Sequence, residues 1–257
     1  MSILNEIAAV AKERVEAAKK IRSAEEIEAL ALSLPKGDFA FEKALKKPGL
    51  SFICECKKAS PSKGIIAEDF PYLDIAKEYE AAGADAISCL TEPKWFLGSD
   101  EYLKEIAANV KIPVLRKDFT VDEYMIYEAK IFGAAAVLLI MAILTDEQVK
   151  EYLSVCDKLG LSALVECHDE DEIKRALDCG GRVIGVNNRN LKDFSVDMGL
   201  AARLRSLIPE DKVFVSESGI KDINDIAKVK EMGADAVLMG EVLMRSSNKA
   251  ELLNSFK

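Results

Sequence analysis

The sequence predicts an α/β fold, a (β/α)8 TIM barrel with extra N-terminal helices, in a single domain over residues 1–257. Three observations indicate this. From residue 51 onward, short apolar stretches alternate with amphipathic stretches of helical period. The apolar stretches are hydrophobic at both parities, which is typical of parallel strands buried on both faces. A chain of 257 residues that is 49% hydrophobic is also large enough for one core of this kind.

Residues 1–47 are predicted to form a helical extension, and residues 48–257 the barrel. Apolar residues recur at helical spacing between charged ones over residues 2–33, which predicts two helices. Ser23, followed by acidic residues, predicts the start of the second helix, because serine caps free amides and acids suit the positive helix end. Pro35 predicts its end. We expect these helices to lie across the outside or one end of the barrel.

A repeated strand–helix unit follows the extension. The predicted strands begin at Ser51, Ala84, Ile112, Ala134, Ser162, Arg182, Val213 and Asp235. The predicted helices cover residues 74–82, 100–108, 121–132, 146–159, 169–179, 197–207 and 221–232, and a last helix closes the chain. A glycine precedes three of the strands, at Gly83, Gly133 and Gly233, and is predicted to end the preceding helix in the left-handed region. A doubly wound open sheet is the alternative, but its glycine-rich dinucleotide motif is missing after the first strand.

Charge and composition exclude several classes of protein. The net charge of -9 and the lack of a basic tail argue against nucleic-acid binding. No apolar run approaches the roughly 20 residues of a membrane span, and no secretory hydrophobic region opens the chain, so we expect a cytoplasmic protein. The six cysteines are expected to be reduced and buried. A zinc site from Cys54, Cys56, Cys167 and His168 is disfavoured by the spacing of the first two.

Polar residues end six of the predicted strands. They are Glu55, Lys57, Lys117, Glu166, Asn187, Arg189, Glu217, Ser218, Gly240 and Glu241. A single charge at a strand end is usually solvated, but the active sites of such barrels lie at these ends, so six together indicate a site. Glu55 and Lys57 share one parity and point the same way on a strand, where their burial is costly.

The loops after the last two predicted strands have the character of a phosphate site. Ser218-Gly219 and Gly240-Glu241 each precede a helical segment, and glycine lets backbone amides approach an anion. Ordinary glycine turns are the alternative. The loop at residues 58–70, with Ser60 and Lys63, is predicted to be a mobile lid that can meet an anion.

Three aromatic residues have open or secondary roles. His168, the only histidine, is predicted to have a supporting polar role rather than a catalytic one. Trp95 and Phe96 either cover an apolar ring of a substrate or pack under a loop.

Long ordered motifs, about one per strand, resemble those of the indole-3-glycerol phosphate synthase family. They are Glu55-Cys-Lys57-Lys-Ala-Ser60-Pro-Ser-Lys-Gly64, Thr91-Glu-Pro-Lys-Trp-Phe96-Leu-Gly98-Ser, Leu115-Arg-Lys117-Asp-Phe119, Leu164-Val-Glu166, Asn187-Asn-Arg189-Asn-Leu191 and Ser216-Glu217-Ser218-Gly219-Ile220. The resemblance covers essentially the whole chain. Cys56 stands where the family more often has an aliphatic residue.

The resemblance implies a carboxy-lyase of tryptophan biosynthesis that uses no metal and no organic cofactor. The substrate would be 1-(2-carboxyphenylamino)-1-deoxyribulose 5-phosphate, and the products indole-3-glycerol phosphate, carbon dioxide and water. Its only partner would be this phosphorylated small molecule, with no nucleic acid and no membrane. We expect a monomer, with weak self-association as the alternative.

The resemblance also implies roles for individual residues. Lys117 would be a general acid, Lys57 would pair with the substrate carboxylate, and Glu166 would be the general base. The remaining catalytic residues would be Glu55, Asn187 and Glu217. Glu55 and Asn187 would orient the sugar hydroxyls and the lysines. Glu217 would complete the charge network together with Arg189, a binding residue. The phosphate would be bound by Ser60, Ser218, Gly219, Gly240 and Glu241. Phe119 and Leu191, with Trp95 or Phe96, would enclose the aromatic ring. How the two lysines divide the acid roles is left open.

Three other functions are compatible with a barrel of this kind. A sugar-phosphate isomerase would share the phosphate loops, but two lysines and a ring-sized pocket fit it less well. A barrel that only binds a ligand or a partner protein would have no use for several costly buried charges. An oxidoreductase that binds flavin mononucleotide would be yellow when purified.

Overall fold

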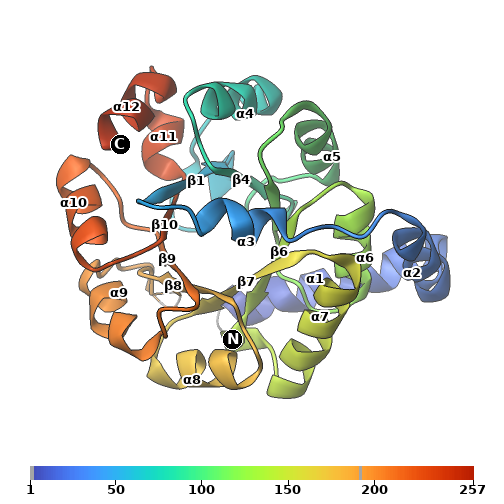
Figure 1. Cartoon of the computed structure of the whole chain (residues 1–257). Helices are drawn as coiled ribbons and strands as arrows, with labels where there is room; N and C mark the ends of the chain where they lie inside the picture. Colours follow the sequence, from blue (N-terminus) through green and yellow to red (C-terminus); the bar gives the residue numbers. More distant parts are fainter. Residues whose placement is uncertain (1–2, 191–192) are drawn as a thin grey trace.

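A computed structural model describes residues 3–190 and 193–257 of the chain. Eight parallel strands form a closed barrel and follow one another around the ring in chain order, which confirms the predicted fold (Figure 1). They are β1 (Ser51–Cys56), β4 (Ala86–Leu90), β5 (Val114–Lys117), β6 (Ala136–Ile140), β7 (Ser162–Cys167), β8 (Val183–Asn187), β9 (Val213–Glu217) and β10 (Ala236–Met239).

Helices surround this barrel as an outer layer (Figure 1). They are α4 (Tyr72–Ala81), α5 (Asp100–Asn109), α6 (Tyr124–Ile131), α7 (Asp146–Leu159), α8 (Glu170–Asp178), α9 (Gly199–Leu204), α10 (Ile223–Glu231), α11 (Glu241–Arg245) and α12 (Lys249–Phe256), with 3-10 turns η1 (Met141–Ile143) and η2 (Arg205–Leu207). Within the barrel strands every residue is buried except Lys117, which ends β5. Burial on both faces explains why the strands read as continuous apolar runs.

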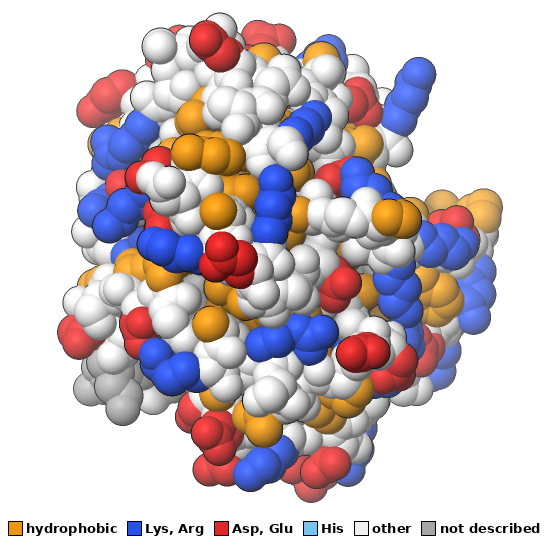
Figure 2. Space-filling view, turned by 60° about the vertical axis from the view of Figure 1, so that its left-hand side comes forward, with side chains coloured by type: hydrophobic (Ala, Val, Ile, Leu, Met, Phe, Trp, Pro, Cys, Tyr) orange, Lys and Arg blue, Asp and Glu red, His pale blue; other side chains and the backbone are white. Residues whose placement is uncertain are grey.

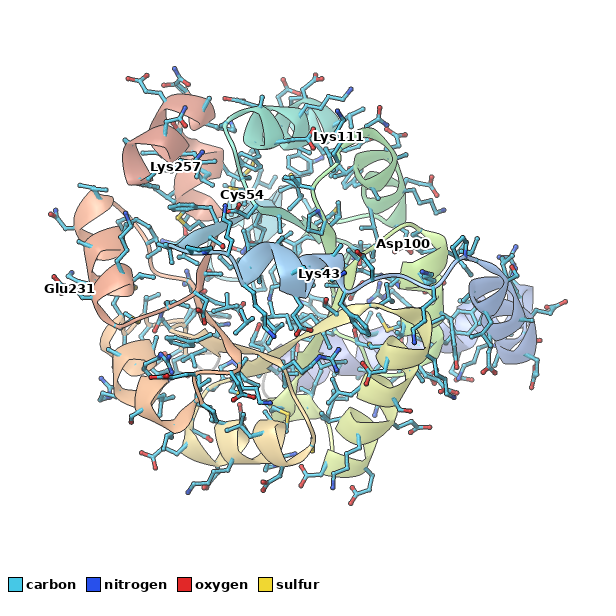
Figure 3. All side chains as sticks on the ribbon, in the orientation of Figure 1. Lys43, Cys54, Asp100, Lys111, Glu231 and Lys257 are labelled. Atoms are coloured by element: carbon cyan, nitrogen blue, oxygen red, sulfur yellow. The ribbon has the colours of Figure 1, made fainter. Side chains whose placement is uncertain are left out.

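Consecutive residues of β5 point to opposite sides of the barrel wall. Lys117 lines the interior of the barrel, whereas Arg116 is buried among the outer helices. The Arg116 guanidinium lies 2.8 Å from the carboxylate of Asp100, at the start of α5, and 3.2 Å from that of Glu128 on α6. Figure 3 shows Asp100 in this outer layer. The alternation follows from the two-residue period of a strand.

The repeated phrase before the strands has a structural reason. The three glycines predicted to end helices have left-handed φ angles, at Gly83 (81°), Gly133 (86°) and Gly233 (72°). Two of them are followed by an aspartate that joins neighbouring strands. Asp85 accepts a hydrogen bond from the N–H of Phe52 at 2.8 Å, and Asp235 accepts one from Phe214 at 2.7 Å. The glycine therefore ends a helix, and the aspartate joins the start of the next strand to its neighbour in the barrel.

The N-terminal extension contains three helices, α1 (Ile3–Ile21), α2 (Ala24–Ser33) and α3 (Ala40–Leu45). The predicted start of α2 is confirmed, since Ser23 and Glu26 form a capping box. In Figure 1, α3 crosses the near end of the barrel and α1 is drawn fainter, behind it. The end crossed by α3 is where the strands begin, because the N–H of Glu42 donates to the hydroxyl of Ser162, the first residue of β7, at 3.1 Å. Helix α1 lies at the opposite end, where it lines the cavity described below.

Four local features differ from the predictions. The helix α3 was missed because six residues form fewer than two turns and show no clear period. The loop at 58–70 contains a short hairpin of β2 (Ala59–Ser60) and β3 (Gly64–Ile65). The predicted helix at 197–207 is shorter and ends as a 3-10 turn, and two helices rather than one close the chain.

The surface mixes charges of both signs. Figure 2 shows acidic and basic side chains interspersed over the face that it presents. Within residues 3–190 and 193–257, no helix has both the length and the apolar character that a bilayer span requires. All six cysteines are free, and five of them are buried.

The connection between α2 and α3 depends on a close contact with the end of α7, and this contact can be tested. Gly160 ends α7 with φ 71°, and a Cβ there would collide with the carbonyl group of Gly37. The N–H of Gly37 donates to the carbonyl of Leu159 at 2.8 Å, so the two segments cannot separate without losing it. We expect Gly160→Ala to lower the free energy of unfolding by about 3 kcal/mol or more, from strain and displacement together.

The matched control for this prediction is Gly180→Ala. Gly180 also has a left-handed φ of 96°, but nothing lies within 4 Å of the added methyl group. It should therefore lose only about 1 kcal/mol, from the backbone strain. Denaturant unfolding of both variants measures the difference, and equal losses would contradict the close-contact explanation.

Candidate active site

A cavity of about 850 Å³ opens at the carboxyl ends of the barrel strands. Every predicted site residue that the structure describes lines it. These are Glu55, Lys57, Ser60, Lys117, Phe119, Glu166, Asn187, Arg189, Glu217, Ser218, Gly219, Gly240 and Glu241. Leu191, the remaining predicted residue, lies outside the described residues. The structure thus brings residues from both halves of the chain to one end of the barrel.

The deepest polar part of the cavity is a layer of four charged side chains. Glu55, Lys117, Glu166 and Glu217 end β1, β5, β7 and β9, which alternate around the ring. Side chains from alternate strands form one layer of a barrel interior. The ammonium of Lys117 lies 3.0 Å from the carboxylate of Glu166 and 3.6 Å from that of Glu217. The layer therefore places one ammonium group among three carboxyl groups.

Burial and charge act in opposite directions on these groups. Burial lowers the pKa of Lys117, but Glu166, Glu217 and Glu55 outweigh it, so the pKa is raised and the amine stays protonated. Burial raises the pKa of Glu166, but Lys117, His168 and Asn187 hold it well below its usual range. For Glu217 burial and the neighbouring carboxylates prevail over Lys117 and raise the pKa. The cluster thus contains one firmly ionised carboxylate and one that binds a proton readily.

The first strand supplies the second lysine of the cavity. The ammonium of Lys57 lies 2.9 Å from Oε1 of Glu55, and the hydroxyl of Ser88 donates to Oε2 of Glu55 at 3.1 Å. Burial raises the pKa of Glu55, but Lys57 and Lys117 outweigh it and lower the pKa. Lys57 also lies 5.6 Å from the centre of the Phe96 ring, so its charge faces an aromatic surface.

Asn187 ends β8, Arg189 follows the strand, and both are fixed by hydrogen bonds. The Asn187 amide donates to Oε1 of Glu166 at 3.1 Å, and its Oδ1 accepts the N–H of Arg189 at 3.1 Å. The Arg189 guanidinium donates to the carbonyl of Phe194 at 3.2 Å. Asn187 therefore fixes the orientation of Glu166 relative to the loop that carries Arg189.

The glycine loops of the predicted phosphate site lie beside one another along one wall. Ser218 and Gly219 both have left-handed φ angles, of 67° and 98°. The amide of Asn188 donates to the carbonyl of Ser218 at 3.2 Å, which fixes this unusual turn. Gly240 lies so close to Glu55 that a Cβ would be 2.8 Å from its Oε1. Any larger residue at Gly240 would have to push the loop away from the charged layer.

Cations gather near these loops. Lys63, on the hairpin loop, lies 3.7 Å from the carboxylate of Glu241, and Arg245 lies 3.1 Å from the same carboxylate. Lys221 lines the cavity as well. Although the chain is acidic as a whole, this end of the cavity therefore presents positive charge, which suits an anionic group.

The opposite wall is apolar and aromatic. The rings of Phe96 and Phe119 lie 6.3 Å apart at an interplanar angle of 40°. Ile3 and Ile7 of α1 complete the wall. Trp95 is not among the described residues that line the cavity; the ammonium of Lys94 lies 4.4 Å from its ring. Of the two aromatic residues left open by the sequence, Phe96 thus belongs to the cavity.

Two buried acids near the cavity were not predicted. Asp118, next to Lys117, lies 2.7 Å from the guanidinium of Arg14 on α1 and accepts the hydroxyl of Thr91 at 2.6 Å. Burial raises its pKa, but Arg14 prevails and lowers it. The Glu92 carboxylate accepts the N–H groups of residues 94, 95 and 96 at 2.9, 2.7 and 3.0 Å. The position of Glu92, an acid just after the second predicted strand, was the feature of the sequence that could have identified it.

Because Glu92 fixes the loop that carries Phe96, its removal should affect substrate binding. We expect Glu92→Ala to raise KM about tenfold and to lower the free energy of unfolding by about 2 kcal/mol, since three backbone N–H groups lose their acceptor. Steady-state kinetics and denaturant unfolding measure the two effects. Glu101→Ala, which removes an exposed carboxylate that is paired with Lys104, is the control and should change neither. An unchanged KM in the Glu92 variant would show that the loop keeps its shape without this acid.

Comparisons with known proteins agree on one family. The model of the family described as indole-3-glycerol phosphate synthase matches residues 4–256. A protein of that name from Ruminiclostridium cellulolyticum is 59% identical over 247 residues, which cover 96% of this chain and 95% of the relative. Another, from Endomicrobium trichonymphae, is 55% identical over 256 residues, or 99% of both chains.

Solved structures with low sequence identity share the fold. A thiamine phosphate pyrophosphorylase from Pyrococcus furiosus has a TM-score of 0.62 at 13% identity, covering 84% of this chain and 95% of that one. A mandelate oxidase with (S)-2-phenylpropionate has a TM-score of 0.58 at 18% identity, covering 71% of this chain and 64% of that one. At such identities the likeness concerns the barrel alone.

Proposed function

The chain belongs to the indole-3-glycerol phosphate synthase family, and from this we propose how the residues of its cavity carry out the reaction. The substrate, 1-(2-carboxyphenylamino)-1-deoxyribulose 5-phosphate, closes a ring onto its carbonyl carbon, loses carbon dioxide and then loses water. The observation that carries the proposal is the pair of Lys117 and Glu166, a protonated amine 3.0 Å from an ionised carboxylate in a buried layer. Such a pair supplies an acid and a base side by side.

Lys117 acts as the general acid in ring closure. When the ring carbon attacks the carbonyl carbon, negative charge develops on the carbonyl oxygen, and the resulting alkoxide is a stronger base than a lysine amine. The raised pKa of Lys117 therefore does not prevent the transfer, and its charge stabilises the oxygen before the proton moves. The carboxylates around Lys117 keep it protonated for each new turnover.

Lys57 binds the substrate carboxylate and holds the aromatic ring against the carbonyl. Lys57 lies beside Phe96, and this supports the role, because the carboxylate is attached to the substrate ring and the groups that bind the two have to be neighbours. After decarboxylation the lysine loses this partner and lies free to protonate the departing hydroxyl. Glu55, 2.9 Å from Lys57, holds its ammonium in place in the absence of substrate.

Glu166 acts as the general base that removes a proton as the indole forms. Counting protons supports the arrangement: two enter, on the carbonyl oxygen and on the leaving hydroxyl, and one leaves the carbon. The proton that Glu166 takes can pass over 3.0 Å to the neutral amine of Lys117. The net uptake is thus one proton per turnover. Asn187 fixes the carboxylate, and Glu217 completes the charge layer.

The phosphate of the substrate lies against the glycine loops. Ser60, Ser218 and the backbone amides of Gly219, Gly240 and Glu241 line that end of the cavity, with the cations Lys63 and Arg245 beside them. A phosphate there would replace the Glu241 carboxylate as a partner of Lys63 and would draw the hairpin loop over the cavity.

We also propose that the chain acts as a monomer in the cytoplasm. All groups assigned to the reaction come from one chain, so no second copy is needed to complete the cavity. Free cysteines suit a reducing compartment.

The acid role of Lys117 is tested by Lys117→Ala. We expect kcat to fall by ~10² to 10⁴-fold, because the variant has no ammonium at the carbonyl oxygen. Product formation is followed by the fluorescence of indole-3-glycerol phosphate, and far-ultraviolet circular dichroism checks the fold. Lys104→Ala, on the outer helix α5, is the control and should keep full activity. Near-normal turnover by the Lys117 variant would remove this residue from the acid role.

The base role of Glu166 is tested by Glu166→Gln, which keeps the shape of the side chain and its acceptor for Asn187. We expect kcat to fall by ~10²-fold or more, while KM changes little, because the base acts only after the substrate has bound. A change confined to KM would instead make Glu166 a binding group.

A further inference from the structure

His168 stands between a carboxylate of the cavity and a carboxylate of the outer layer. It follows β7 by one residue, and its Nε2 lies 3.3 Å from Oε1 of Glu166. This Nε2 has no well-formed hydrogen bond within the described chain. Its Nδ1 lies 3.0 Å from Oε2 of Glu172. His168 does not itself line the cavity, so any effect on the substrate has to pass through Glu166.

Glu172 holds the imidazole in place from the first turn of α8. The same Oε2 that meets Nδ1 of His168 also accepts the backbone N–H of His168 at 2.8 Å. The backbone N–H of Glu172 in turn donates to the side chain of Asp169, the N-cap of the helix, at 2.8 Å. Backbone, ring and cap are therefore fixed together, and the only remaining polar edge of the ring faces Glu166.

We propose that His168 is a positioning residue, which, anchored by Glu172, fixes the carboxylate of Glu166 and keeps it ionised for proton removal. This proposal rests on the general-base role of Glu166 proposed above. Both oxygens of Glu166 then have partners: Oε2 faces Lys117, and Oε1 faces Asn187 and His168. Without the imidazole, a neutral amide alone would orient Oε1.

The charges around Glu166 show why a second cation matters. Lys117 and His168 face it as cations and Asn187 as a neutral donor, while Glu55 adds negative charge to the same layer and Glu217 is a carboxyl group with a raised pKa. Burial lowers the pKa of His168, but its close contacts with the carboxylates of Glu166 and Glu172 raise the pKa to about 10, so the ring is charged at neutral pH. Lys117 changes its protonation state during the reaction, whereas His168 supplies a constant positive charge.

The test compares His168→Leu and His168→Gln in the full chain. His168→Leu removes donor and charge, and we expect kcat to fall about 10- to 100-fold with KM nearly unchanged, because the base loses its orientation after binding. The pKa of Glu166 rises without the cation, so the acid limb of the kcat profile should move to higher pH by about one unit. His168→Gln, which keeps a donor without the charge, should regain part of kcat and keep the shifted limb.

Two further variants separate this proposal from the assignment of the base. In a Glu166→Gln background, adding His168→Leu should cause no further loss of kcat, since the histidine acts through that carboxylate. Arg175→Gln, which breaks the ion pair between Arg175 on the same helix α8 and Asp146 at the start of α7, is the structural control and should leave kcat and its pH profile unchanged.

The outcomes are distinguishable. If Glu166→Gln is inactive while His168→Leu keeps the wild-type kcat and acid limb, the positioning role is overturned and the base assignment stands. If Glu166→Gln keeps its turnover, both are overturned. A loss of kcat in His168→Leu without any movement of the acid limb, and equal to that of Arg175→Gln, would also contradict the proposal, because it would reflect helix α8 alone.

Discussion

The interior of this barrel ends in a layer of titratable side chains, and because these side chains are buried they have to pair with one another. Glu55, Lys117, Glu166 and Glu217 come from alternate strands and fill the level at which the cavity begins. Two residues earlier on the same strands stand Ile53, Leu115, Leu164 and Val215, all fully buried. The apolar layer below excludes water from one side of the charges, so their mutual pairing has to replace much of their hydration. The short distances within the layer follow from this requirement.

The same requirement prepares the site for an anionic substrate. In the chain alone, Lys57 is paired with Glu55 and Lys117 with Glu166, so both ammonium groups are held in place before any substrate binds. Under the proposed mechanism, a substrate carboxylate and a developing alkoxide would meet charges that are already in place. Preorganised charge of this kind stabilises a transition state without reorganisation at the moment of reaction. It also explains how a chain with a net charge of -9 can bind anions.

The features of the fold and the site that could be predicted from sequence are those that depend on residues close together in the chain. A polar residue at the end of an apolar strand is a local signal in the sequence, so Lys117 and Glu166 could be predicted as site residues, and both line the cavity. Partners far apart in sequence gave no such signal: Arg14 and Asp118 are 104 positions apart. The helix α3 was too short to show a period. His168 has one partner close by in sequence, Glu172 on α8, four residues away. Its contact with Glu166 depends on the directions in which the two side chains leave the end of β7, and it was not predicted.

Three consecutive charged residues show that the N-terminal helix α1 belongs to the site. Lys117 faces the cavity, Arg116 faces the outer helices, and Asp118 meets Arg14 of α1. Asp118 is buried and its pKa is held low chiefly by Arg14 against the effect of burial, so the loss of α1 would remove the ion-pair partner of a buried carboxylate beside the proposed acid. Ile3 and Ile7 of the same helix also form part of the cavity wall. One ion pair and one apolar contact thus join the N-terminal extension to the end of the barrel where the cavity opens.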